Sequence, residues 1–211
     1  MNLSEIRQDY IKRTLDADRA GSDPFKLFNQ WLDEAIKAEA LEPTAMSVST
    51  VSSEGKPSSR MVLLKGTESG RFVFFTNYNS HKGQNIRDNP YVALLFFWPE
   101  LERQVRIEGK ADKIAEHESD IYFDSRPLQS RIGAIISPQS SVISNRQVLE
   151  EKFETTVKNL IVSEITRPGY WGGYAVIPET VEFWQGRASR LHDRIQFRRE
   201  VDNWIKERLA P

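Results

Sequence analysis

The feature that most constrains this chain is a series of short apolar segments between residues 45 and 112. Within them apolar residues recur with a period of two or in brief runs, and turn-forming residues such as Gly55, Gly70 and Pro90 separate them. A period of two is the repeat of a half-buried β-strand. The pattern predicts strands at 45–52, 58–66, 71–76, 91–98 and 102–112, with a short helix at 80–88.

Helical segments flank these strands. Asp23 followed by Pro24 is typical of a helix start, and apolar residues at helical spacing from Leu27 to Ile36 continue the helix until Pro43 ends it. Further helices are expected at 115–125, 128–136 and 144–161, and further strands at 173–177, 180–185, 190–198 and 202–208.

Short strands that follow one another in sequence favour an antiparallel sheet closed into a small barrel, with helices packed outside it. The predicted fold class is therefore α+β, with about six to eight strands. In this interpretation residues 1–22 form a loosely held arm or short helix, and residues 23–211 form a single domain.

Composition excludes several classes of protein. The formal net charge of −1 gives no general attraction to nucleic acid or to an anionic membrane. The lack of cysteine removes disulfides, thiolate metal sites and cysteine nucleophiles, and the histidines His81, His117 and His192 lack the paired spacing of metal ligands. The N-terminus has no apolar stretch typical of a signal peptide, and the longest apolar run, Tyr91 to Trp98, is too short to span a bilayer. We therefore expect a soluble, cytoplasmic protein without a metal.

Cationic residues at a predicted helix start indicate anion binding. Ser80 is a good N-cap for the helix at 80–88, yet the first turn carries His81 and Lys82. Cations there are unfavourable unless an anion docks on the free N–H groups. A solvated surface turn explains the same residues equally well.

Two strand segments also carry cations. On a strand, Arg190, His192 and Arg194 would project from one face, where they would meet an anionic ligand or, as the residues alone favour, solvent. Arg60 and Lys65 bracket an apolar strand on opposite faces, so they can serve one cleft only through a bulge or through the strand ends.

A fourth cationic group lies in the predicted helical region. Tyr122, Arg126 and Ser130 are spaced by four, as on one helical face, but Pro127 disfavours helix at Arg126. We expect Arg126 at a junction between two short helices, where Ser130 can reach the same anion.

Ten segments in order resemble the pyridoxamine 5′-phosphate oxidase family essentially from end to end. They are RMVLLK (60–65), FFTNYNSHKG (74–83), LERQVRIEGKA (101–111), YFDSRP (122–127), SRIGA (130–134), SPQSS (137–141), WGGY (171–174), EFWQG (182–186), RLHDR (190–194) and RLAP (208–211). The resemblance implies an FMN-binding split β-barrel that forms a homodimer, with two sites between the subunits.

The same resemblance implies roles for individual residues. The expected FMN-binding residues, some of them contributed by the partner subunit, are Arg60, Met61, Val62, Leu63, Leu64, Lys65, Phe75, Thr76, His81, Lys82, Gln104, Gln139, Ser140, Trp184 and Arg194. The expected substrate-binding residues are Arg7, Gln8, Asp9 and Tyr10 of a closing N-terminal segment, with Lys65, Tyr122, Arg126, Ser130, Arg190, Leu191 and His192. Arg190 and His192 are the expected catalytic residues.

The implied reaction is oxidation of pyridoxamine or pyridoxine 5′-phosphate by O2 to pyridoxal 5′-phosphate, with FMN as the redox cofactor. The chain departs from the usual family pattern at His81, where arginine is common, and at Phe75, where tyrosine is common. Histidine is only partly charged near neutral pH, so FMN affinity is expected to be weaker or pH-dependent. The rival interpretations are another flavin-using split-barrel enzyme, such as a flavin reductase, and a carrier of FMN or pyridoxal phosphate.

Overall fold

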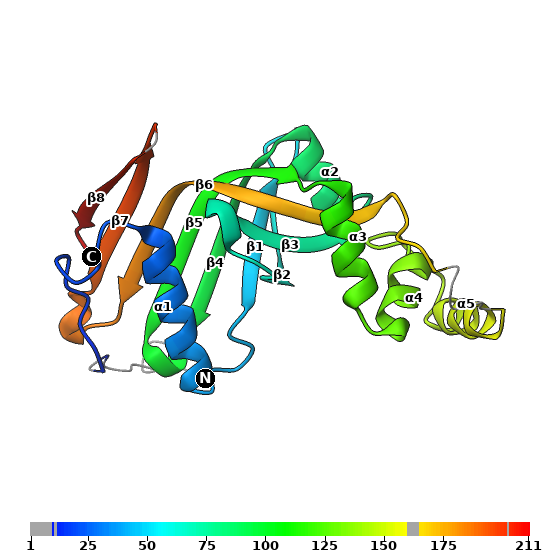
Figure 1. The fold of residues 1–211 in the computed structure, drawn as a ribbon, viewed down its shortest axis with the longest axis horizontal. Coiled ribbons are helices and arrows are strands. Elements are labelled where there is room, and N and C mark those ends of the chain that lie inside the picture. Colours follow the sequence, from blue (N-terminus) through cyan, green and yellow to red (C-terminus); the bar gives the residue numbers. More distant parts are fainter. Residues whose placement is uncertain (1–9, 11, 160–164, 202) are drawn as a thin grey trace, which may run out of the picture.

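The computed structural model describes residues 10, 12–159, 165–201 and 203–211, and Figure 1 shows their arrangement. The helices are α1 (Pro24–Lys37), α2 (His81–Asp88), α3 (Glu116–Ser125), α4 (Leu128–Ile136) and α5 (Gln147–Lys158). The strands are β1 (Ala45–Val51), β2 (Pro57–Leu63), β3 (Phe72–Asn77), β4 (Tyr91–Trp98), β5 (Arg103–Lys113), β6 (Trp171–Gln185), β7 (Asp193–Glu200) and β8 (Asn203–Leu209). Arg7, Gln8 and Asp9, which were expected to bind substrate, lie outside the described residues.

The strands form one antiparallel sheet in the order β2-β1-β4-β5-β6-β7-β8, and β3 pairs with β6. β6 is the central element, because it pairs with β5 along most of its length while its other edge is divided. Residues 171–176 pair with β3, and residues 180–185 pair with β7. The sheet therefore splits at the middle of β6, which confirms the α+β split-barrel prediction.

The sequence pattern divided β6 into two strands, and this was wrong. Pro178 lies in the interior of one continuous strand, opposite Gly109, where the β5–β6 register shifts. Proline is tolerated at such a bulge because no ladder hydrogen bond is required of it there. Gly109 is needed because an added Cβ would lie 2.1 Å from the carbonyl oxygen of Ile177.

Two other boundaries also differ from the prediction. β7 begins at Asp193 and not at residue 190, because Ser189 and Arg190 adopt positive φ values of 57° and 60° and form a turn. α5 begins at Gln147 and not at residue 144, and the side chain of Asn145 accepts a hydrogen bond from the Val148 N–H at 3.2 Å. The predicted continuation of this helix to residue 161 runs into residues that the structure does not describe.

The core lies between α1 and the sheet. α1 starts as predicted, with the Asp23 carboxylate accepting from the Phe25 N–H at 2.9 Å. Its apolar face places Phe28 in edge or tilted contact with Phe72, Phe96 and Trp98, at ring-centroid distances of 5.0, 5.0 and 6.2 Å. This aromatic cluster attaches α1 to β3 and β4.

The described part of the N-terminal arm runs along the C-terminal strands and is fastened to them. Leu15 and Ala20 are buried, and the Lys12 N–H donates to the Glu102 carboxylate at 3.0 Å. The Lys206 ammonium donates to the carbonyl of Gly21 at 2.9 Å. Among the described residues, no helix combines the length and the apolar character that a membrane crossing requires.

Replacing Phe28 by alanine should lower the free energy of unfolding by about 3–5 kcal/mol, because the cavity left in the aromatic cluster cannot collapse around it. Urea unfolding at fixed protein concentration measures the change. Leu41→Ala, at a side chain 87% exposed, is the matched control and should change stability by less than about 0.5 kcal/mol. A Phe28→Ala protein as stable as this control would contradict the proposed core.

Candidate functional site

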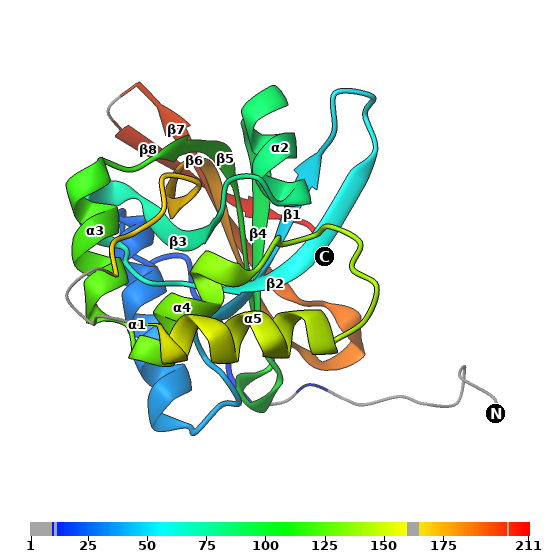
Figure 2. The same cartoon turned by 90° about the vertical axis from the view of Figure 1, so that its right-hand side faces the viewer.

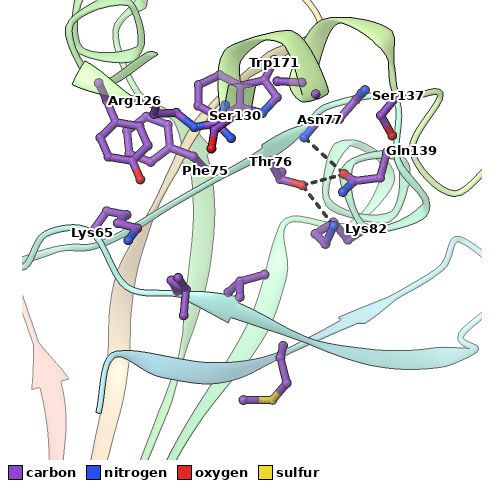
Figure 3. A pocket seen from close by; sticks show the side chains of 16 residues that line it. Lys65, Phe75, Thr76, Asn77, Lys82, Arg126, Ser130, Ser137, Gln139 and Trp171 are labelled. Atoms are coloured by element: carbon purple, nitrogen blue, oxygen red, sulfur yellow. Dashed lines mark hydrogen bonds between the residues drawn. The ribbon is translucent and has the colours of Figure 1, made fainter. Parts of the chain in front are cut away.

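A cavity of about 520 Å³ opens between β2, β3 and the α3–α4 pair. Figure 2 shows α4 and α5 lying across this end of the sheet, and Figure 3 shows the cavity from close by. The lining residues are Met61, Val62, Leu63, Lys65, Phe75, Thr76, Asn77, Lys82, Tyr122, Arg126, Ser130, Gly133, Ala134, Ser137, Gln139 and Trp171. The volume is within the range of about 300–1,000 Å³ that is usual for ligand pockets.

The charge of this cavity is one-sided. Lys65, Lys82 and Arg126 line it, and no aspartate or glutamate does. The chain as a whole has a formal net charge of −1, so the positive charge of the cavity differs from the nearly neutral charge of the whole protein. Cations that face one another without a carboxylate repel unless an anionic ligand joins them.

The cations stand at two ends of the cavity. In Figure 3, Lys82 lies at one end beside Gln139, whereas Lys65 and Arg126 lie at the other. A single small anion would need only one such group. Two separated groups indicate either two anionic ligands or one ligand with two anionic ends.

At the first end, α2 places Lys82 where it is buried and only 7% exposed. Ser80 caps the helix as predicted, with its hydroxyl oxygen accepting from the Gly83 N–H at 3.3 Å. The Lys82 ammonium donates to the Thr76 hydroxyl at 3.0 Å, and that hydroxyl donates to the Gln139 side-chain oxygen at 3.2 Å. The Gln139 oxygen is thereby occupied, which leaves its amide N–H groups for a ligand.

Burial, and in second place the nearby Arg60 guanidinium, lower the pKa of Lys82 from its usual range to about 8. Arg60 itself does not line the cavity; it donates to the Thr50 hydroxyl, the Val48 carbonyl and the Ser58 hydroxyl, all of them neutral. Among the described residues, neither cation has a carboxylate partner. A phosphate would supply the missing negative charge.

At the second end, Arg126 occupies the junction between α3 and α4, as its Pro127 neighbour predicted. Its Nη1 is buried and has no hydrogen-bond partner among the described residues. Unpaired buried donors are rare, and they indicate a missing partner. Lys65 lies just beyond the end of β2, so the strand end brings it to this cavity without a bulge.

Three aromatic rings line the cavity beside Arg126. The rings of Phe75 and Tyr122 are stacked with centroids 3.8 Å apart, and the Trp171 ring is nearly parallel to that of Tyr122 at 6.2 Å. The Arg126 guanidinium lies 4.7 Å from the centroid of Trp171. Sequence reasoning missed Trp171 as a site residue, since it lies far from the other cationic and aromatic positions in the chain and resembles an ordinary strand start.

A second group of expected residues lies elsewhere on the sheet. Gln104, Trp184 and Arg194 are direct register partners on β5, β6 and β7 and form a row across these strands. Glu182, which is buried, accepts from the Arg194 Nε at 2.8 Å and from Arg106 at 2.6 Å, and so fixes both guanidinium groups. No residue of the row lines the cavity.

His192 packs on this row, with its ring centroid 4.6 Å from that of Trp184 and 5.8 Å from that of Tyr10. Its Nδ1 accepts a hydrogen bond from the Arg187 N–H at 3.1 Å, so the proton of the neutral ring resides on Nε2. Burial, and then the positive charge of Arg190, lower the pKa of His192. In this geometry His192 can donate from Nε2 but cannot accept a proton at Nδ1.

Several expected residues are placed outside both groups. Arg190 and Leu191 are exposed in the turn before β7, so the predicted strand that would align Arg190, His192 and Arg194 on one face was wrong. His81 is exposed at the start of α2, Leu64 is buried in the core, and neither lines the cavity. The cavity lining also excludes Ser140, which has a φ of 72° next to Gln139.

Comparison with protein families matches residues 32–158 to a family model described as pyridoxamine 5′-phosphate oxidase. Residues 171–211 match a second model, described as the pyridoxine 5′-phosphate oxidase C-terminal dimerisation region. The chain belongs to the pyridoxamine 5′-phosphate oxidase family. This confirms the resemblance found in the sequence.

Similar proteins support the family over the full length. The chain is 58% identical over 211 residues to a pyridoxine/pyridoxamine 5′-phosphate oxidase of Haemophilus influenzae, with 100% of both chains covered. It is 53% identical to one of Leptospira biflexa, with 100% of this chain and 99% of the other covered. Among solved structures, PhzG of Burkholderia lata in complex with tetrahydrophenazine-1-carboxylic acid matches with a TM-score of 0.89 and 27% identity, covering 97% of this chain and 100% of that one.

The two residue groups of this family member stand at opposite ends of one strand. Trp171, in the cavity wall, begins β6, and Trp184, in the row, lies near its end. At about 3.3 Å per residue they are roughly 40 Å apart along the strand. Trp184 and Arg194 of the row and the turn of His192 lie within residues 171–211, the segment matched as the dimerisation region, and so does Trp171, whereas Gln104 lies outside that segment. A site that used both groups would therefore need residues from two chains.

The lowered pKa of Lys82 predicts a pH dependence of FMN binding. Above about pH 8 the free protein loses the Lys82 proton, and a bound phosphate must recover it, so the dissociation constant should rise by up to about tenfold per pH unit. Below this pKa Lys82 is already charged, so its contribution to the free energy of FMN binding does not change with pH. Flavin fluorescence titrations from about pH 7 to 9 measure the effect.

Lys82→Arg is the matched control, because a guanidinium stays protonated over this range and should give a flat profile. A wild-type profile that is equally flat would contradict the role of Lys82. Extension of the titration to about pH 6 in wild type and in His81→Asn tests the contribution of His81: a pH-dependent component of FMN binding that is present in wild type and absent from His81→Asn belongs to this side chain.

Proposed function

We propose that the chain is an FMN-dependent oxidase that converts pyridoxamine 5′-phosphate and pyridoxine 5′-phosphate to pyridoxal 5′-phosphate, the last step of vitamin B6 cofactor synthesis and salvage. O2 is reduced to H2O2, and the amine substrate also consumes water and releases NH3. The observation that carries the proposal is the cavity with cations at both ends and no acidic residue. It suits a phosphorylated cofactor and a phosphorylated substrate that lie side by side. The full-length relatives bear the same activity in their names.

The residues present fit FMN. Lys82 and Arg60 are partly or fully buried cations without a carboxylate partner among the described residues, and they suit the FMN phosphate. Thr76 and Gln139 offer polar groups beside them, and Met61 to Leu63 supply an apolar edge for a flat ring. The chemistry that FMN supplies when bound is acceptance of a hydride equivalent from substrate C4′ and delivery of the electrons to O2.

The other end of the cavity suits the substrate phosphate. The unpaired Nη1 of Arg126 and the Lys65 ammonium provide charge-assisted hydrogen bonds, and Ser130 and Tyr122 add hydroxyl groups. Anchoring the phosphate fixes the distance between the pyridine ring and the flavin. This positioning is the contribution to catalysis that these residues make.

The protein works as a homodimer, as its C-terminal dimerisation region indicates. In the proposed site, Gln104, Trp184 and Arg194 of one subunit complete the FMN shell of the other. Arg190 and His192 then face the substrate ring, where the Nε2–H of His192 orients the C4′ substituent and the Arg190 charge balances the electron flow from it. We place the enzyme in the cytoplasm, as the cysteine-free sequence led us to expect.

An anaerobic absorbance titration of FMN-loaded protein with pyridoxine 5′-phosphate tests the function. The oxidised-flavin band should bleach, and it should return on admission of air together with pyridoxal phosphate and peroxide. If FMN stays oxidised although the substrate binds, the protein is a carrier. If only a reduced nicotinamide bleaches the band, it is a flavin reductase.

Replacing Arg126 by alanine should raise the Michaelis constant for pyridoxine 5′-phosphate by about 10- to 100-fold, because a charge-assisted contact to phosphate is lost. FMN affinity should stay within about twofold, since Lys82 lies at the other end of the cavity. Arg146→Ala, on the exposed start of α5, removes the same charge outside the site and should leave both constants unchanged. Equal Michaelis constants in the two variants would remove Arg126 from the substrate site.

Replacing Arg190 by alanine should lower kcat by about 100-fold with little effect on FMN binding, because its charge is used during hydride transfer. Stopped-flow reduction of the loaded enzyme separates this step from product release. Arg199→Ala, an exposed arginine on the same hairpin, is the control. An unchanged reduction rate in Arg190→Ala would reject its direct role.

A further inference from the structure

The turn that carries Arg190 and His192 is held in an unfavourable backbone conformation. Ser189 and Arg190 both have φ values near +60°, in the left-handed region that glycine adopts readily but that L-residues other than asparagine and aspartate seldom adopt. Such conformations persist where surrounding contacts impose them. The contacts that do so identify the residues that place the catalytic turn.

Arg187 makes two of these contacts. Its backbone N–H donates to Nδ1 of His192 at 3.1 Å, and its Nη1 donates to Oδ2 of Asp193 at 3.0 Å. The first contact fixes the His192 ring and its tautomer, and the second fixes Arg187. Together they close a loop from residue 187 to residue 193 around the turn.

Asp193 is the point where three segments meet. Its Oδ2 also accepts from the Leu15 N–H of the N-terminal arm at 3.1 Å, and its Oδ1 accepts from the Arg208 Nη1 of β8 at 3.0 Å. The Asp193 side chain is only 18% exposed, whereas Arg187 and Arg208 are 39% and 49% exposed. The carboxylate is thus the fixed partner, and the two arginines reach toward it.

We propose that Asp193 is a positioning residue for the oxidase reaction: through Arg187, its carboxylate holds the 187–192 turn and keeps His192 as the Nε2–H tautomer. This inference rests on the proposed function, in which His192 and Arg190 face the substrate. Asp193 itself does not touch the reacting atoms. Its contacts to the arm and to β8 anchor the carboxylate, and the contact to Arg187 transmits its effect.

A cycle of kinetic variants tests the route through Arg187. Asp193→Asn and Arg187→Gln should each lower kcat by about tenfold, and the double variant should be no slower than either, because both remove one contact. FMN affinity should stay within about twofold in all three. Arg208→Gln removes the β8 contact to Asp193 and the hydrogen bond from the Arg208 Nη2 to the Leu15 carbonyl, but it leaves the contact between Asp193 and Arg187. This variant and Glu200→Gln, which removes an exposed ion pair on β7, should each stay within about twofold of the wild-type kcat.

The proposal would be overturned if the kcat losses of the single variants multiply in the double variant. It would also be overturned if the kcat loss is explained by loss of FMN. An Arg187→Gln enzyme as fast as wild type would likewise overturn it. If Asp193→Asn does not fold, the kcat of Arg187→Gln alone tests the proposal, because this variant leaves the Asp193 carboxylate with its partners on the N-terminal arm and β8.

Histidine-selective ¹⁵N spectroscopy of the FMN-loaded dimer provides a readout that does not depend on turnover. The chain has three histidines, and His192→Asn assigns the His192 signals by their loss. Wild type should show a single Nε2–H tautomer for His192, and Asp193→Asn and Arg187→Gln should show a mixture of tautomers. An unchanged tautomer in these two variants would refute the positioning role and leave the proposed oxidase intact. Full turnover in His192→Asn and Arg190→Ala would instead refute the catalytic assignment.

Discussion

The continuous strand β6 is the constraint on which the rest of the structure depends. It pairs with β5 along most of its length, and its other edge is divided between β3 and β7, so it joins both parts of the split sheet. Its first residue, Trp171, closes the cavity wall, and Trp184 near its end anchors the row with Gln104 and Arg194. A strand is stiff and extended. The two groups therefore cannot meet within one chain, and a catalytic site that uses both requires two copies.

The cavity places function in conflict with stability. Burial of Lys82 near Arg60 without a carboxylate disfavours its charged form, as its pKa of about 8 shows. The unpaired Nη1 of Arg126 also carries a desolvation cost. Both costs are recovered when anions bind, and ligands that bind only the folded state stabilise it. Buried Glu182, by contrast, is paired with both Arg106 and Arg194.

Most secondary structure could be predicted from local chemistry. The Asp23–Pro24 start, the Ser80 cap and the break at Pro127 each depend on neighbouring residues only, and all three are confirmed. The wrong predictions occurred where residues far away in the chain determine the local backbone conformation. The sequence pattern ended a strand at residue 177, but the bulge at Gly109 of β5 accommodates Pro178 within one continuous strand. The turn at Ser189 and Arg190 is imposed by contacts that the sequence pattern cannot show.

The sequence by itself determined the fold class, the family and the kinds of charged group available, because hydrophobic period, capping residues and ordered motifs are local properties. The tertiary structure decided which of these groups share a cavity. Lys82 lies at one end of the cavity and Lys65 and Arg126 lie at the other, and Trp171 also lines it. Outside the cavity, a row across β5, β6 and β7 contains Gln104, Trp184 and Arg194. The tertiary structure also set the tautomer of His192 and the anchorage of its turn at Asp193. The physical reason is that a pKa, a hydrogen-bond partner or a shared cavity depends on atoms that lie close in space and far apart in the chain.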